Sequence, residues 1–277
     1  MRFEDDSQED DTYNRHHTET ADVMKKISSV FDSSCTVRVQ VQDGVIRFST
    51  LLSATSNAHT VLCMHLRDLP ITVRTGHLSV LVRTSLLSRI YGRCDGSSKW
   101  RWSVEDDAIS GKHNLVIERI EANVAEAGVV YKVPIKRDER GDPDLEIGIP
   151  DRIVNMQAAL VVKLANLLAH WGRRSKWITL KAYREAVTIK GNDDLLSFSM
   201  SIQQQQQQNA HRTHEDNDYA EVTVDCKQFY RSLLPVRLEP HAQADISLGI
   251  SQDALTVKVN SVGKWTCASI LAIKLSE

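Results

Sequence analysis

Cysteine is scarce in this sequence, and the few cysteines are scattered. The 277 residues include five, at Cys35, Cys63, Cys94, Cys226 and Cys267, and no two of them form a CxxC pair. Such an odd, dispersed set argues against a disulfide framework and against a zinc knuckle. It is typical of reduced thiols in an intracellular protein.

Long hydrophobic runs are missing as well. The apolar stretches are short and interrupted, so no segment is predicted to cross a membrane. Residues 1–11 are crowded with acids, which is unlike a secretory or transit peptide. A hydrophobic content of 42% and a charged content of 25% are typical of a globular protein. The length predicts two domains of about 140 residues each.

The sequence also lacks the common catalytic motifs. It contains no GxSxG elbow, no HExxH and no glycine-rich phosphate loop. His211 and His214 lie in a polar segment with no helix to fix them around a metal ion. The acidic pairs 106–107 and 193–194 are interpreted as turn residues between strands. We therefore predict no catalytic residues, no metal and no cofactor, and the alternative is an enzyme whose site is unrecognised.

Many segments of the sequence alternate apolar and polar residues with a period of two, as β-strands do. Residues 36–41 alternate, and Gly44 is predicted to turn the chain into a second strand at 45–50. The segment 99–102 alternates lysine or arginine with tryptophan and lies in a strand predicted at 98–104. Its tryptophans are interpreted as both in the core or as one in each of two environments, the alternative being a stacking platform for nucleic acid. Further strands are predicted at 59–66, 77–82, 113–120, 128–136, 143–149, 176–183, 186–190, 194–202, 219–225, 243–250, 254–260 and 264–274.

Helices are predicted at 21–32, 84–93, 151–172 and 226–234, and the order of helices and strands is the same in both halves of the chain. This repetition predicts an α+β protein of two similar domains, with helices packed on antiparallel sheets. The predicted domains are 1–137 and 143–277, joined by a connector at 138–142. Within them, 4–20 is predicted to be disordered and 203–218 to be a polar glutamine-rich insertion.

Each predicted helix combines an apolar side with a basic side. In 151–172 the apolar side comprises Ile153, Met156, Leu160, Leu164, Leu167 and Trp171, and Asp151 stands where an acid favours the helix dipole. Basic stripes would neutralise phosphates without reading bases, so we predict sequence-independent contact with duplex DNA. The alternative is that these are solvated helix faces. The residues predicted to face DNA are Lys25, Lys26, Arg89, Arg93, Arg152, Lys163, Arg173, Arg174, Lys227 and Arg231.

Several short stretches along the chain form a recognisable set. They are Met1-Arg2-Phe3, 34–38 (SCTVR), 129–136 (VVYKVPIK), 142–150 (DPDLEIGIP), His214-Glu215-Asp216, 220–225 (AEVTVD) and Leu233-Leu234. Together they resemble one family, the hydroxyurea-sensitivity checkpoint proteins, which form one third of the heterotrimeric DNA-damage checkpoint clamp, the nine-one-one clamp.

The resemblance implies two sliding-clamp domains in a non-enzymatic nuclear protein. The implied partners are two other clamp subunits of similar fold, double-stranded DNA, a clamp loader, and checkpoint and repair proteins. The alternative is a replicative clamp that closes as a homotrimer. The family also implies that two edge strands pair with neighbouring subunits, and an unpaired strand edge is adhesive. The residues concerned are Val130, Lys132 and Pro134 on one strand and Leu196, Phe198 and Met200 on the other.

Overall fold

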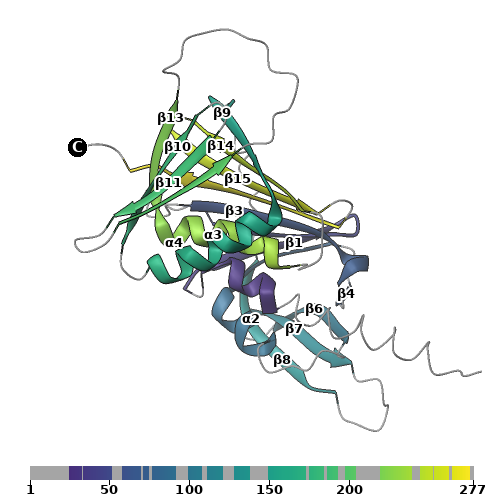
Figure 1. The fold of residues 1–277 in the computed structure, drawn as a ribbon. Coiled ribbons are helices and arrows are strands. Elements are labelled where there is room, and N and C mark those ends of the chain that lie inside the picture. Colours follow the sequence, from purple (N-terminus) through teal and green to yellow (C-terminus); the bar gives the residue numbers. More distant parts are fainter. Residues whose placement is uncertain are drawn as a thin grey trace, which may run out of the picture. The chain divides into compact units, whose positions relative to one another are not determined.

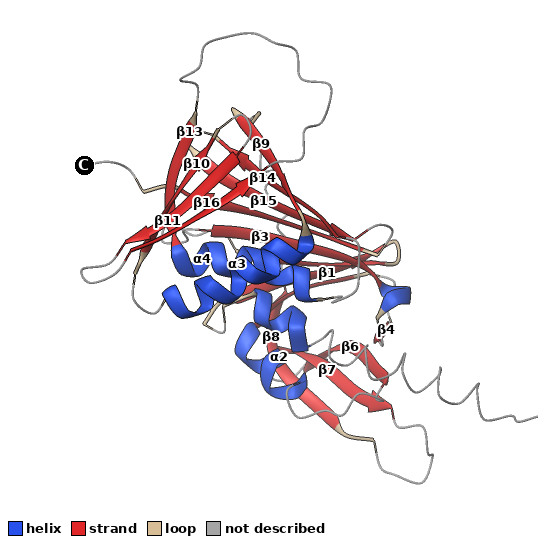
Figure 2. Cartoon of the chain, in the orientation of Figure 1, coloured by secondary structure: helices blue, strands red, loops and turns tan. Residues whose placement is uncertain are grey.

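The structure is a computed structural model, and it consists mainly of strands (Figure 2). It describes residues 25–32, 34–51, 58–69, 71–74, 77–91, 99–107, 111–120, 128–137, 149–172, 175–183, 186–192, 197–203, 219–238, 244–251, 253–261 and 264–274. The chain divides into two compact units, Met1–Leu51 with Cys63–Gly141 and Leu52–Leu62 with Asp142–Glu277. The predicted disordered head and residues 204–218 of the predicted insertion lie outside the described residues.

The first unit contains helical residues 25–30, helix α2 (Thr84–Tyr91) and a sheet whose strands follow the order β4-β6-β7-β8-β5-β1-β2. Its strands are β1 (Thr36–Gln42), β2 (Val45–Thr50), β4 (Ile71–Val73), β5 (Leu78–Arg83), β6 (Lys99–Asp107), β7 (Lys112–Ile120) and β8 (Val130–Arg137). Strand β3 (Ala58–His65) is divided, with its residues up to Leu62 in the second unit. A short 3-10 helix, Leu66–Asp68, follows β3.

The hairpin of β1 and β2 forms as the sequence predicts. Gln42 pairs with Val45, which leaves a two-residue loop. Both loop residues have positive φ, 51° at Asp43 and 74° at Gly44. This is the type I′ geometry that matches the right-handed twist of paired strands, and Asp-Gly suits it because both residues tolerate that conformation.

Both tryptophans of β6 are buried, which confirms the core interpretation of the alternating segment. Trp100 is 1% exposed and Trp102 is fully buried. The indole N–H of Trp102 donates a hydrogen bond to the Tyr91 hydroxyl at 2.9 Å, so its one polar atom is satisfied. The short strand β4 pairs in parallel with β6 and was not predicted, because three residues are too few for a periodic signal.

The second unit contains two sheets and the helices α3 (Ala158–Trp171) and α4 (Cys226–Leu233). One sheet has the order β3-β16-β15-β14-β9, and the other has the order β12-β11-β10-β13. The helices α3 and α4 contact each other and lie side by side (Figure 1). The strands are β9 (Arg152–Met156), β10 (Trp177–Ala182), β11 (Ala186–Asn192), β12 (Ser197–Gln203), β13 (Ala220–Asp225), β14 (Ala244–Ile250), β15 (Ala254–Ser261) and β16 (Trp265–Ala272).

The prediction of a helix over 151–172 is wrong in its first third. Residues 152–156 form strand β9, which pairs antiparallel with β14, and the helix begins only at Ala158. In β9, Val154 and Met156 are buried while Ile153 is 60% exposed, as expected for alternating side chains. Asp151 therefore precedes a strand and does not act on the helix dipole.

The buried side of α3 also differs from the predicted one. Val161, Ala165 and Leu168 are buried together with Leu164 and Trp171, whereas Leu167 is exposed. Apolar residues occur around most of this helix, so the sequence allows more than one buried side. Contact with the sheet and with α4 selects the one that is observed.

Helix α4 follows the prediction closely. The Asp225 carboxylate accepts a hydrogen bond from the backbone N–H of Gln228 at 2.9 Å and caps the helix. Phe229 and Leu233 are fully buried, as predicted. A 3-10 turn, Leu234–Arg237, continues the helix and contains Pro235. None of the helices in the described part of the chain is both long enough and apolar enough to span a membrane.

Candidate nucleic-acid interface and assembly edges

The helices of the second unit expose cationic side chains. Lys163 of α3 and Lys227 of α4 are exposed. On the same exposed side of α3 lie Asn166 and His170, at the helical spacing expected from the sequence. The Arg237 guanidinium donates a hydrogen bond to the side-chain oxygen of Asn166, which ties the 3-10 turn to α3. Because α3 and α4 contact each other, their exposed lysines belong to one helical layer.

Two other predicted residues of this unit are placed differently. Arg152 lies on strand β9 opposite Ile250 and is half-buried, so it is not part of a helix face. Arg231 is on α4 as predicted, but its side chain is also half-buried. Arg173 and Arg174 lie outside the described residues.

In the first unit, Lys25 is exposed and Lys26 is half-buried, on helical residues 25–30. Ile27 and Val30 are buried on the opposite side, as predicted. On α2, Arg89 is exposed. Leu87 and Ile90 of the same helix are buried. Arg93 lies outside the described residues. Contact of these cations with DNA stays a prediction.

Strand β8 has an open edge. Among the described strands it pairs with β7 through most of its length but with β5 only at Lys136 and Arg137. The Arg119 N–H donates to the Val129 carbonyl at 2.8 Å, so by alternation Lys132 and Pro134 direct their backbone groups toward the open edge. Pro134 therefore costs β8 no hydrogen bond to β7, which is the position where a strand tolerates proline.

The side chains of Val130, Lys132 and Pro134 share one exposed face of β8, whereas Val133 and Ile135 on the other face are buried. The Lys132 ammonium forms an ion pair with Glu105 at 2.8 Å.

Strand β12 is the second open edge, because it is the terminal strand of its sheet among the described residues. Phe198 packs edge-on against Trp171 of α3, with ring centroids 4.7 Å apart. Between them lies Gly191, where an added Cβ would come within 2.1 Å of the Phe198 ring. Met200 is half-buried on the same face and opposite Ile189, and Leu196 lies outside the described residues. Pairing of either edge with another subunit stays a prediction.

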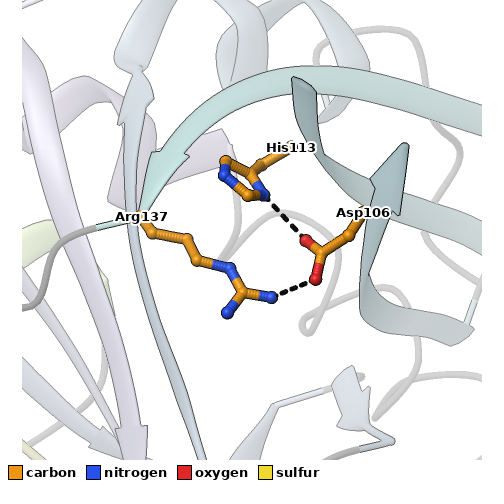
Figure 3. Close-up of polar contacts among 3 residues, drawn as sticks. All are labelled: Asp106, His113 and Arg137. Atoms are coloured by element: carbon orange, nitrogen blue, oxygen red, sulfur yellow. Dashed lines mark hydrogen bonds and ion pairs between the residues drawn. The ribbon is translucent and has the colours of Figure 1, made fainter. Parts of the chain in front are cut away.

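Asp106, predicted to be a turn residue, lies inside strand β6 and forms a three-residue polar cluster (Figure 3). Its carboxylate is 2.8 Å from His113 Nδ1 and accepts a hydrogen bond from Arg137, the last residue of β8. The bond with His113, followed by the one with Arg137, lowers the pKa of Asp106 below its usual 3.8. The register that places Asp106 opposite His113 is the signal that sequence reasoning missed.

The described residues offer no metal centre, and the Cys226 thiol among them is not activated. They contain no group of three His, Cys, Asp or Glu side chains placed to hold a metal ion. Burial, followed by the neighbouring Asp225 charge, raises the pKa of the Cys226 thiol to about 11, so that thiol stays protonated. The acidic pair at 193–194 and the histidines at 211 and 214 lie outside the described residues.

Comparison with solved structures identifies the fold. A crystal structure of Proliferating Cellular Nuclear Antigen from Entamoeba histolytica superposes with a TM-score of 0.66 at 14% sequence identity, over 92% of this chain and 96% of that one. A structure described as the C-terminal region of FEN-1 bound to A. fulgidus PCNA superposes with a TM-score of 0.65 at 12% identity, over 93% and 97% of the two chains. Models of known protein families and curated protein sequences give no match.

The chain therefore has the sliding-clamp fold of PCNA, which confirms the predicted fold class. At these identities the likeness establishes the fold alone.

Proposed function

We propose that this chain is a non-enzymatic subunit of a clamp that encircles duplex DNA. The observation that carries the proposal is the extent of the match, because nearly the whole of this chain corresponds to nearly the whole of two PCNA chains. A clamp needs no catalytic residues, and it needs a cationic lining that holds phosphates without reading sequence. Exposed Arg89, Lys163 and Lys227 on the helices suit that lining.

We further propose that the clamp is the heterotrimeric checkpoint clamp of the nucleus, built on two clamp domains at 1–137 and 143–277. The support is the resemblance of segments such as 129–136 and 220–225 to the hydroxyurea-sensitivity checkpoint proteins. In that assembly the open edges of β8 and β12 pair with two different subunits. A clamp loader places the ring on damaged DNA, and checkpoint and repair proteins bind to it.

A replicative clamp is the second candidate, because both structural neighbours contain PCNA. The two candidates differ in assembly. A replicative clamp closes as a ring of identical subunits, whereas a checkpoint subunit needs two different partners. Light scattering of the purified chain, together with identification of similarly sized proteins that copurify with it from its own cells, separates them. A stable homotrimer contradicts the checkpoint proposal.

The DNA-facing residues are tested in the assembled ring. Arg89→Glu, Lys163→Glu and Lys227→Glu together reverse three exposed helix charges and are expected to weaken retention on circular DNA at least tenfold, because each lost phosphate contact weakens binding. The loss of contacts should also make retention less dependent on salt. The matched control is Lys258→Glu on β15, an exposed lysine that lies on a strand. Unchanged retention of the triple variant on circular DNA contradicts the placement of these residues.

A further inference from the structure

We propose that the outer face of the sheet β12-β11-β10-β13 binds single-stranded nucleic acid. The inner face of this sheet is buried, with Ile178, Leu180 and Val224 at 1% exposure or less. The alternate residues of the same strands remain partly or fully exposed, so the outer face is free among the described residues. This function is separate from contact between the helices and duplex DNA, and it does not require a closed ring.

An exposed tyrosine pair marks one end of the face. Tyr183 directly follows β10 and Tyr219 directly precedes β13, and the register Ala182 to Ala220 brings the two tyrosines opposite each other. Their ring centroids are 5.7 Å apart with the planes inclined at 37°. The two residues are 44% and 48% exposed, so the core does not account for them. Exposed aromatic faces are surfaces on which bases stack.

Lys181 holds this aromatic pair in position. Its ammonium lies 5.0 Å from the centroid of the Tyr219 ring and forms an ion pair with Glu221 at 2.6 Å. The hydrogen bond with Glu221 raises the pKa of Lys181, which keeps the ammonium charged. The tyrosine ring is therefore oriented by a cation–π contact before any ligand arrives.

A cationic group marks the other end of the face. The ammonium groups of Lys176 and Lys274 lie 4.9 Å and 5.7 Å from the Trp177 ring centroid. Lys274 is held there because its backbone N–H donates to the Thr223 carbonyl at 2.7 Å. Both lysines are exposed, so two positive charges stand at a fixed place on the sheet.

Hydroxyl groups and a further lysine lie between the two ends. The hydroxyls of Thr179 and Thr223 are 3.0 Å apart across β10 and β13. Exposed Lys190 is opposite Thr179 on the other side of β10. From Trp177 to Tyr183 the strand spans roughly 20 Å at about 3.3 Å per residue. This length suits a backbone of several nucleotides, with phosphates near the lysines and bases near the tyrosines.

The aromatic pair favours nucleic acid over an acidic peptide. Lysines attract any polyanion, but carboxylates do not stack on the two exposed rings, whereas unpaired bases do. A four-stranded antiparallel sheet with exposed aromatic residues is a known platform for single strands. Duplex DNA is disfavoured because its bases are stacked on one another and offer no free faces.

The test measures binding of a short fluorescent oligothymidylate to the full chain by anisotropy. Tyr183→Ala with Tyr219→Ala is expected to raise Kd about tenfold or more at fixed salt. The matched pair Tyr183→Phe with Tyr219→Phe keeps the rings and is expected to retain the affinity. Lys176→Ala with Lys274→Ala is expected to reduce the slope of log K against log salt by roughly 0.7 per lost contact.

Three results overturn the proposal. The first is an unchanged Kd in the tyrosine-to-alanine pair, with folding verified by circular dichroism. The second is equal displacement of the probe by polyglutamate, which would identify the face as a site for acidic proteins. The third is equal binding of the matching duplex. Lys163→Ala on α3 is expected to leave oligothymidylate binding unchanged, so failure of this proposal is distinguishable from failure of the clamp proposal.

Discussion

The two strand edges predicted to pair with other subunits, β8 and β12, are anchored alike but carry different outer faces. On its inner face β8 buries Val133 and Ile135, while β12 places Phe198 against Trp171. On the outer face, β12 carries exposed serines at 197, 199 and 201, whereas β8 carries Lys132 in an ion pair with Glu105. At the end of β8, beyond the buried Ile135 and on the same side of the strand, Arg137 forms an exposed ion pair with Asp106.

The difference teaches that, beyond backbone pairing, the described side chains of β12 hold it by packing and the Thr188–Ser201 hydroxyl contact, whereas those of β8 add ion pairs to packing. Packing is insensitive to salt and to moderate changes of pH, whereas exposed ion pairs weaken with both. Changes on the inner faces should therefore affect both strands strongly, and changes of charge should affect only β8.

The largest loss of stability is expected where Phe198 of β12 packs against Trp171. Gly191→Ala places a Cβ within 2.1 Å of Phe198 and 2.3 Å of Trp171 Nε1, so both rings must move. We expect a loss of about 3 kcal/mol in the free energy of unfolding, measured by urea denaturation. Ser199→Ala on the exposed face of β12 is the control and should change stability by less than about 0.5 kcal/mol. A stable Gly191→Ala variant would show that Phe198 does not pack here.

A smaller loss of stability is expected at the buried face of β8. Val133→Ala removes two buried methyl groups from a side chain that is 4% exposed. The expected loss is about 2 kcal/mol in the same urea experiment, because each buried carbon contributes about 0.8 kcal/mol and a cavity remains. Val130→Ala, on the exposed face of the same strand, serves as control. Equal losses in the two variants would contradict the assigned faces of β8.

The exposed ion pair between Lys132 of β8 and Glu105 should contribute less to the free energy of unfolding. Lys132→Glu replaces the ion pair with Glu105 by repulsion, but both side chains are more than half exposed. We expect a loss of about 0.5 kcal/mol at low salt that disappears in high salt, because solvent and salt screen exposed charges. Unfolding midpoints at two salt concentrations measure it, with Lys132→Gln as the neutral control. A salt-independent loss would mean that Lys132 acts through packing.

The smallest effect concerns pH. The folded pKa of Asp106 lies below 3.8, so its contribution to stability is present above that value and is lost as pH falls through the folded pKa. Asp106→Asn lacks this contribution, so its unfolding midpoint should be lower than that of the wild type at pH 7 and should approach it in strong acid. A difference that persists unchanged from neutral pH into strong acid would refute the linkage.

The local pattern of apolar and turn residues was sufficient to predict many of the strands and helices. The hairpin around Asp43 and Gly44, the buried tryptophans of β6 and the apolar side of α4 all follow from periodicity and turn chemistry within a few residues. The exposed positions of Lys163, Arg89 and Lys227 follow from the same periodicity. Local pattern failed at 152–156, where Ile153 and Met156 fit a helical spacing and Val154 and Met156 fit a strand equally well.

The sequence by itself determined the alternation of the strands, the β1–β2 turn and the apolar side of α4, because these depend on neighbours a few residues away. Only the tertiary structure decided that 152–156 is a strand, since its hydrogen bonds go to β14, about a hundred residues further along the chain. The tertiary structure also brought Asp106, His113 and Arg137 together and joined two tyrosines and four lysines on one sheet face. Such groupings arise from strand register, which pairs residues that are distant in sequence and leaves no local signal.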